Sequence, residues 1–342
     1  MPAPDLSIII PVYNSAKWLA DCLDSLLRHN EVNSEILCID DGSTDDSPSV
    51  LAQYLGRYPK RIKVLTQSNQ GQSAARNAGI DIAQGQYLWF FDSDDRCTPN
   101  RLDRILQQAD DAGLDVRLFA GKSFRDSSAS IRQWLNYLIY YKRGLQNPQI
   151  LSGMEIAALL AARGMWRPSP VMYFINRRYL AEVGTRFIPG IIHEDDAFTF
   201  DVVLKAKRTF QGPEQLYLRR IRANSTMTGK DKAYSAYSYT QAFGAMLDTC
   251  QSLNPPDEAT ARYVAEIVAR IGNAAAKLAA PGYQDINDRL ASAPDSPIKS
   301  LVRNRLTSPD SFADTPTYRF ARTFIHDAAH FSLAWWRGDN SE

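Results

Sequence analysis

Acidic side chains gather at three places in this chain of 342 residues. They are Asp-Asp at 40–41, Asp-Ser-Asp-Asp at 92–95 and Glu-Asp-Asp at 194–196. Carboxylates that lie close together repel one another unless a cation neutralises them, and their repulsion raises their pKa values. The chemistry that suits such groups is the binding of a divalent cation or the removal of a proton from a substrate.

The run Asp92–Asp95 is the best candidate for a cation site. Mg²⁺ or Mn²⁺ in proteins is often held by one or two carboxylates together with substrate phosphates. A metal there would neutralise a departing diphosphate. A plainer alternative is a loop turn in which Asp side chains accept hydrogen bonds from backbone N–H groups. For residues 194–196 the alternative is that they are acids in the first turn of a helix, where the helix dipole stabilises negative charge.

The elements around these acids alternate between strand and helix periodicity. Short apolar, β-branched or aromatic runs predict strands, and apolar residues at helical spacing predict the helices between them. The predicted strands in the first 120 residues are Leu6–Pro11, Glu35–Asp40, Ile62–Thr66, Gln86–Phe91 and Val116–Ala120. This alternation predicts an α/β, Rossmann-like fold with a mostly parallel sheet flanked by helices. Ligands of such sheets bind at the carboxyl ends of the strands, where the acids lie.

The pattern loosens after residue 121. Helices are expected at 130–141, 153–162 and 194–205, and short strands at 172–176, 209–211 and 216–221. From residue 231 onward only helical segments remain, and prolines interrupt them. We therefore predict a catalytic domain at residues 1–228 and an all-helical C-terminal region at 229–342.

Composition excludes several classes of protein. Lys and Arg number 39 against 38 Asp and Glu, so no overall basic excess points to nucleic acid. The four cysteines form no CxxC pair and no disulfide framework. Neither a leader segment nor an apolar run of membrane-spanning length is evident, which places the expected location in the cytoplasm.

Residues 318–337 have the pattern of a basic amphipathic helix with a pair of tryptophans. Such a helix can lie on an anionic membrane surface, here the inner face of the membrane. It can also pack on the catalytic domain or on a second copy of the chain. His326 and His330 have metal-ligand spacing but lack the glutamate of a zinc-protease helix, so we assign them no metal.

Five segments occur in an order that resembles the family 2 glycosyltransferases, which are inverting enzymes of the GT-A fold. They are Ser7–Asn14 (SIIIPVYN), Glu35–Ser47 (EILCIDDGSTDDS), Asn69–Gly79 (NQGQSAARNAG), Phe91–Asp95 (FDSDD) and His193–Phe198 (HEDDAF). The resemblance covers about residues 5–228. It implies a nucleotide-sugar donor, with a UDP-sugar favoured, and Mn²⁺ or Mg²⁺ as cofactor.

The resemblance also implies roles for donor-binding residues. Pro11 and Tyr13 would line the base pocket, and Asp41 would accept a hydrogen bond from a uracil-type ring N–H. Asp94 would contact both metal and nucleotide, with Asp92 and Asp95 sharing metal, ribose and sugar. Three arginines would face the nucleotide or its diphosphate, and these are Arg76, Arg220 and Arg222.

The same resemblance implies that Asp195, beside Glu194, is the catalytic base. Asp196 leaves a one-residue alternative open. On the acceptor side it implies Trp166, Arg167 and His193, with a core tryptophan as the equal alternative for Trp166. The implied reaction is inverting transfer of a sugar to a hydroxyl of a glycan or lipid-linked acceptor, as in the synthesis of surface polysaccharides. The alternatives are a catalytically inactive, scaffold-like relative and, less favoured, a sugar nucleotidyltransferase.

Overall fold

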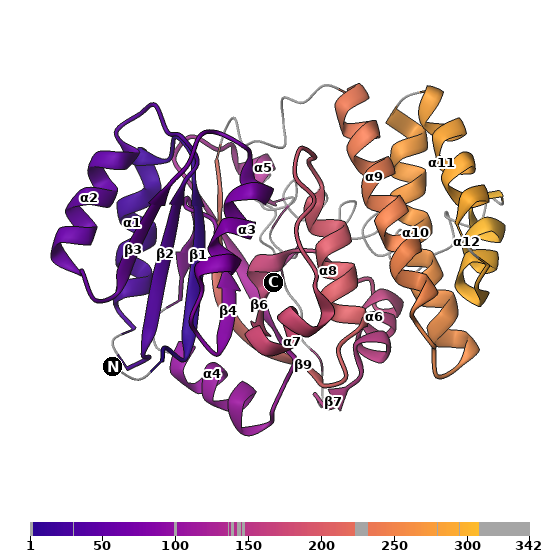
Figure 1. Ribbon diagram of the computed structural model, residues 1–342, viewed down its shortest axis with the longest axis horizontal. Coiled ribbons are helices and arrows are strands. Elements are labelled where there is room, and N and C mark those ends of the chain that lie inside the picture. The colour runs from indigo at the N-terminus through magenta and orange to yellow at the C-terminus, as the bar shows by residue number, and fades with distance from the viewer. Residues whose placement is uncertain are drawn as a thin grey trace, which may run out of the picture.

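The computed structural model describes residues 3–307, except 30, 99–100, 136, 138–139, 142–144, 146–147, 223–231, 279 and 294. Within these ranges a nine-stranded sheet is flanked by helices, and a layer of longer helices follows at the C-terminal side (Figure 1). The predicted helix at 318–337, with His326 and His330, lies outside the described residues. The predicted domain boundary near residue 228 falls in one of the gaps.

The N-terminal half of the sheet follows the predicted pattern closely. Strands β1 (Leu6–Val12), β2 (Ser34–Asp40), β3 (Ile62–Thr66) and β4 (Tyr87–Phe90) run parallel in the order β3-β2-β1-β4. Between them lie α1 (Ala16–Leu27), α2 (Ser47–Arg57) and α3 (Gln72–Ile82). Because the strands are parallel, their carboxyl ends lie at one edge and bring residues 12–14, 40–42 and 91–95 together.

The second half of the sheet is mixed. Strand β8 (Tyr173–Asn176) runs antiparallel between β4 and β6 (Val116–Arg125), and β9 (Thr209–Ile221) runs parallel to β6. The short strands β5 (Arg96–Cys97) and β7 (Ile150–Leu151) are antiparallel to β9. The strands β1, β2, β3, β4, β6 and β9 share one direction, so the mostly parallel α/β sheet is confirmed.

Strand β9 replaces the two short strands expected at 209–211 and 216–221. The ladder between β6 and β9 shifts register between Leu118 and Ala120, opposite Gly212 and Pro213. A bulge of this kind leaves the proline outside the hydrogen-bonded ladder, so the strand continues past it. The expected helix at 130–141 is also shorter, because α5 covers only Ile131–Leu135.

Alternating side chains of the strands feed two separate apolar cores, one on each face of the sheet. On β1, Ile8 and Ile10 pack with α1, α2 and α4 (Leu102–Asp111), whereas Ile9 packs on the opposite face with α3. Gly79 allows this second contact, since a Cβ there would lie 2.3 Å from Ile9 Cγ2. Helices α6 (Gly153–Ala162), α7 (Arg177–Val183) and α8 (Glu194–Leu204) pack on that second face. The 3₁₀ turn Pro170–Met172 lies between α6 and α7 in the chain.

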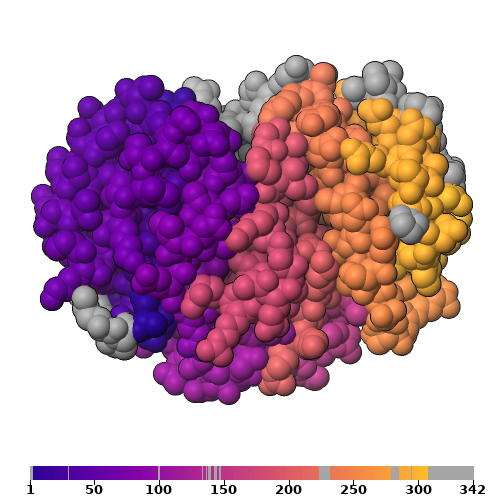
Figure 2. Space-filling model, in the orientation of Figure 1, coloured from indigo at the N-terminus to yellow at the C-terminus, as the bar shows by residue number. Residues whose placement is uncertain are grey.

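The C-terminal layer consists of α9 (Lys232–Gln251), α10 (Glu258–Leu278), α11 (Ala280–Ser292) and α12 (Pro297–Thr307). Helix α9 contacts α8, and α10 contacts α6, so the core of the second sheet face runs on without a break to Val302. Figure 2 shows the pink segment that includes α7 and α8 lying between the violet N-terminal part and these orange helices. No described helix combines the length and apolar character needed to cross a bilayer.

Candidate active site

Arg76 connects two of the three acidic groups. It lies in α3 and is 2% exposed. Its Nη1 donates to Asp195 Oδ1 at 2.9 Å and to Glu194 Oε1 at 3.0 Å, and its Nη2 donates to Asp92 Oδ1 at 3.3 Å. Burial alone would lower the pKa of this guanidinium, but the three carboxylates raise it above its usual value. Arg76 is therefore a permanent buried cation between the groups at 92–95 and 194–196.

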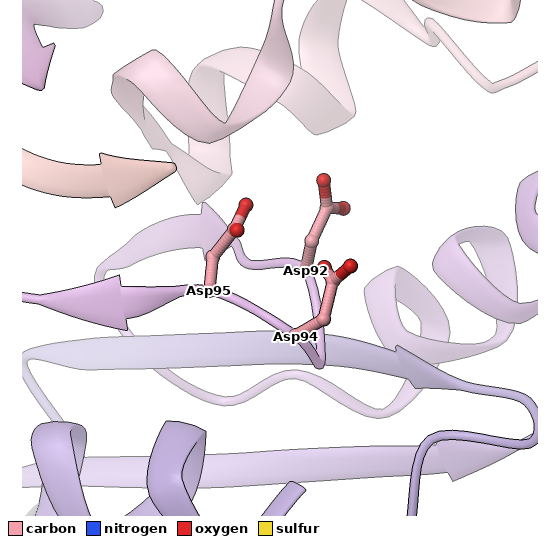
Figure 3. A group of neighbouring side chains, drawn as sticks. All are labelled: Asp92, Asp94 and Asp95. Atoms are coloured by element: carbon pink, nitrogen blue, oxygen red, sulfur yellow. The ribbon is translucent and has the colours of Figure 1, made fainter. Parts of the chain in front are cut away.

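The carboxylates of Asp92, Asp94 and Asp95 form one cluster on the loop between β4 and β5. Each offers an oxygen that lies within 4.8 Å of the others. Figure 3 shows the three side chains pointing to the same side of this loop. Asp92 and Asp94 are partly exposed, whereas Asp95 is fully buried. Three hard oxygen ligands at this spacing suit Mg²⁺ or Mn²⁺, so the residues present fit the implied metal.

Strand β9 supplies the basic side chains that face this cluster. Arg219 Nη1 donates to Asp92 Oδ2 at 2.6 Å and to Asp95 Oδ2 at 3.1 Å. Two residues away on the same strand face, the Tyr217 hydroxyl also donates to Asp95 Oδ2. Just past the strand, Arg222 Nε donates to Asp94 Oδ2 at 2.8 Å. The cluster is thus bordered by Arg76, Arg219 and Arg222.

Arg220, which the family resemblance placed at the diphosphate, is held elsewhere. Neighbouring residues of a strand point to opposite faces, so Arg220 turns away from Arg219. Its guanidinium donates to the Asp94 carbonyl at 2.6 Å and forms an ion pair with Asp21, and it lies 4.7 Å from the Phe124 ring. These contacts fasten the loop that carries Asp94, and the motif did not single out Arg219, which contacts Asp92 and Asp95.

Asp41 organises the loop before α3. It is buried, and its Oδ1 accepts hydrogen bonds from Gln67 Nε2 at 2.7 Å and from the Gln70 N–H at 2.8 Å. Its Oδ2 accepts from the Gly71 N–H at 2.8 Å. Gly71 has φ +87°, a conformation that glycine adopts without steric cost. Asp41 thus fixes the turn that starts α3 and so the direction of Arg76.

Pro11 and Tyr13 lie at the carboxyl end of β1, as the parallel sheet requires. Pro11 is buried within the strand, while the Tyr13 side chain is 50% exposed. An exposed ring at the strand ends is available to stack on a planar ligand. The loop behind it is tied to the one after β2, because Asn14 Oδ1 accepts from the Thr44 and Asp45 N–H groups at 2.8 and 3.3 Å.

Helix α8 begins with the third acidic group. Asp195 has a side chain that is 34% exposed, and Glu194 beside it is largely buried. Desolvation, opposed by Arg76 and reinforced by the carboxylates of Glu194, Asp92 and Asp196, raises the pKa of Asp195 to about 8. Asp196 shows a smaller rise, to about 6, caused first by burial. A partly exposed carboxylate with a raised pKa is suited to accept a proton near neutral pH.

The residues expected on the acceptor side have different surroundings. Trp166 is 4% exposed and belongs to the apolar core of the second sheet face. Arg167 donates from Nη1 to the Trp166 carbonyl at 2.8 Å and lies 4.9 Å from the Tyr140 ring. His193 precedes α8, and its ring stacks on Tyr239 of α9. Of the three, only His193 directly adjoins the acids of α8 in the chain.

Comparison with known proteins identifies relatives of this chain. The family model for glycosyl transferase family 2 matches residues 7–163. An uncharacterized glycosyltransferase of Haemophilus influenzae (strain ATCC 51907 / DSM 11121 / KW20 / Rd) is 31% identical over 210 residues, which cover 61% of this chain and 76% of that protein. The uncharacterized glycosyltransferases YibD of Escherichia coli (strain K12) and EpsJ of Bacillus subtilis (strain 168) are 31% and 32% identical over 62% and 65% of this chain. The matches span 60% and 62% of their lengths.

Solved structures show the same fold. The crystal structure of S. aureus TarS (1–349) in complex with UDP-GlcNAc superposes with a TM-score of 0.68 at 19% identity, covering 95% of this chain and 92% of that one. The mannosyltransferase PcManGT from Pyrobaculum calidifontis, in complex with GDP-Man and Mn²⁺, gives a TM-score of 0.55 at 15% identity, covering 99% and 89%. Because the superposition extends over nearly the whole chain, the predicted GT-A fold with C-terminal helices is confirmed.

Proposed function

Because the chain belongs to glycosyl transferase family 2, we propose that it transfers a sugar from a nucleotide-sugar donor to a hydroxyl group of a glycan or lipid-linked acceptor, with inversion at the anomeric carbon. The observation that carries this proposal is the contact of Arg76 with both Asp195 and Asp92. It brings a proton acceptor close to a cluster of hard oxygen ligands, with one buried cation between them. A role in surface polysaccharide synthesis is proposed from the resemblance alone.

Asp195 is the proposed general base. A sugar hydroxyl is a weak nucleophile at neutral pH, and a carboxylate that takes its proton as the new bond forms lowers the barrier. Arg76 holds Oδ1, whereas Oδ2 has no hydrogen bond among the described residues. Oδ2 is thus available for the acceptor proton. Attack opposite the departing nucleotide diphosphate inverts the anomeric carbon without a covalent intermediate.

The proposed cation is Mn²⁺ or Mg²⁺, held by Asp94 and Asp92. When bound it would neutralise charge that develops on the leaving diphosphate. Asp95 is the least suited to direct ligation, since its side chain is fully buried and three donors hold its carboxylate, whereas Asp92 and Asp94 are partly exposed. We propose that Asp95 instead fixes the loop, and that Arg219 and Arg222 are the basic groups nearest to the diphosphate.

UDP is the proposed nucleotide. In support, Asp41 follows β2 and Tyr13 follows β1 at the same edge of the parallel sheet, and the Tyr13 ring is exposed. The TarS structure with UDP-GlcNAc has this fold, although the archaeal neighbour binds GDP-Man. The donor base and sugar therefore need direct measurement, for which a thermal-shift screen of nucleotide-sugars with Mn²⁺ is suited.

The assignment of Asp195 as the base is tested with two single substitutions in the same helical turn. With the donor and acceptor identified, Asp195→Asn should lower the rate of transfer by roughly 10²–10⁴-fold, since it removes general base catalysis, and should leave donor affinity unchanged. Asp196→Asn is the matched control and should keep most of the activity. Full transfer by Asp195→Asn would reject the assignment, and loss confined to Asp196→Asn would move the base by one residue.

A further inference from the structure

We propose that the first half of α9 positions the catalytic base, by holding the segment Gly190–His193 through Tyr234, Ser238 and Tyr239. This inference rests on the proposed role of Asp195 in sugar transfer. It gives the C-terminal helices a part in the chemistry, although none of their side chains is placed in contact with the reacting atoms. The three α9 residues are therefore positioning residues.

The segment before the base has an unusual backbone. His193 has φ +65° and ψ 23°, the left-handed conformation that residues with a Cβ seldom adopt. Gly190, three residues earlier, also has a positive φ, of +70°. A strained non-glycine residue persists only where its surroundings fix it. The start of α8, and with it the direction of Asp195, depends on this conformation, because the Asp196 N–H donates to the His193 carbonyl at 3.2 Å.

Three contacts from α9 meet this segment, at Gly190, Ile192 and His193. The Tyr234 hydroxyl donates to the Gly190 carbonyl at 2.9 Å, and the Ile192 N–H donates to Ser238 Oγ at 3.2 Å. The His193 ring stacks on Tyr239 with 3.8 Å between ring centroids and 8° between planes. Helix α9 thus holds the segment at Gly190, at Ile192 and at the strained residue His193.

These contacts are themselves built into the helix. Tyr234 and Ser238 lie one turn apart, and the buried Ser238 Oγ donates to the Tyr234 carbonyl at 2.8 Å. Ser238 therefore donates within α9 and accepts from the segment, which satisfies a polar group that is costly to bury alone. Farther along, Thr249 Oγ1 donates to Asp201 Oδ1 at 2.6 Å, so α9 is also fastened to α8 at a residue of α8 beyond its first turn.

A base held on two sides can be kept in register with a substrate. Arg76 holds the carboxylate of Asp195 from α3, and α9 holds the backbone that aims it. If the α9 contacts are lost, Arg76 still binds the carboxylate, but the first turn of α8 is free to shift. Misplacement of a reacting group by about 1 Å can cost on the order of 10²-fold in rate. Donor binding, which uses the strand ends, should be unaffected.

The experiment compares Tyr239→Leu with Tyr239→Phe in the full-length chain. Phenylalanine keeps the stack and leucine removes it. Thr249→Val is the matched control, since it weakens the docking of α9 on α8 away from the base. Steady-state transfer gives kcat and donor KM, and hydrogen–deuterium exchange of a peptide covering residues 188–197 reports on the segment whether or not transfer is measured.

We expect Tyr239→Leu to lower kcat by roughly 10- to 100-fold with donor KM within a factor of about two, and to speed exchange at residues 190–196. Tyr239→Phe should match the parent chain in both measurements, and Thr249→Val should lose thermal stability with parental kcat and exchange in this peptide. Unchanged exchange in Tyr239→Leu overturns the inference, as does parental kcat. A parent chain that transfers no sugar contradicts the proposed function, while exchange still decides whether α9 holds the segment.

Discussion

The acids at 92–95 and those at 194–196 lie on either side of Arg76 but are held by different kinds of structure. The first group lies on a loop between two strands, and Arg219 of β9 and Arg222 just past it hold its carboxylates directly. The second group lies in the first turn of a helix. There a strained backbone sets the direction of the side chains, and α9 contacts that backbone.

This difference separates two requirements of sugar transfer. Residues that face a highly charged donor need charge compensation, which strand arginines supply at fixed spacing. A base needs orientation toward a neutral hydroxyl group, and packed helices supply it. Arg76 contacts both groups through its buried guanidinium, so its loss should have the largest effect.

Arg76→Met should abolish measurable transfer and destabilise the protein by about 3–5 kcal/mol, because it leaves Asp92, Glu194 and Asp195 facing one another without a buried cation. Urea unfolding and initial rates would test this. Arg186→Met is the control, since Arg186 and Asp81 form an exposed pair worth less than about 1 kcal/mol. Equal stability of the two variants would show that the acid groups are independent of Arg76.

Within the acids at 92–95, Asp94→Asn and Asp95→Asn should separate binding of the metal from structural support of the loop. Asp94→Asn should weaken Mn²⁺ binding by about 100-fold or more, the upper end of losses from changes around a metal site, with little change in stability. Asp95→Asn should cost about 1–3 kcal/mol of stability, because three donors lose their full partner, and should weaken Mn²⁺ binding less. Titration calorimetry and thermal unfolding would measure both effects, and the reverse pattern would exchange the two roles.

The smallest expected effect is a displaced pH profile. A base acts only when deprotonated, so kcat/KM should rise with pH and level off above about 8, the pKa to which burial and neighbouring carboxylates raise Asp195. Glu194→Gln removes one of these negative charges and should therefore lower that pKa and move the rise to lower pH. A rise that stays in place, or that moves to higher pH, would show that Glu194 does not act on the base.

Much of the fold was predictable from local pattern. Parallel strands buried on both faces are continuous apolar runs, and β1, β2 and β3 match their predicted spans within a residue. The antiparallel direction of β8 depends on pairing between segments that are distant in the sequence, and a local sequence pattern does not predict such pairing. The length of β9 was missed because Gly212 and Pro213 resemble a strand end, and only the bulge against β6 keeps the strand intact.

For the candidate site, the sequence predicted which residues lie together better than it predicted the contacts between them. Asp92, Asp94, Asp95, Arg76 and Asp195 do come together. Arg220 stays a prediction at the diphosphate, but the contacts of Arg219 with Asp92 and Asp95 were not predicted, because a spacing pattern does not say which strand face meets the loop. Side chains alternate along a strand, so Tyr217 and Arg219 share one face of β9. Once the contact of Tyr217 with Asp95 is known, this alternation places Arg219 beside the same acid. Trp166 was open between core and acceptor, and its burial places it in the core.

The continuous core beneath α6 and α8 has a consequence for any shortened form of the chain. Gly153 touches the end of α8 so closely that a Cβ would lie 1.6 Å from the Val203 carbonyl oxygen, and the apolar residues of these two helices pack on α9 and α10. A fragment that ends before α9 would turn those covered faces toward water. Large exposed apolar patches promote aggregation, so we expect a fragment without the C-terminal helices to aggregate.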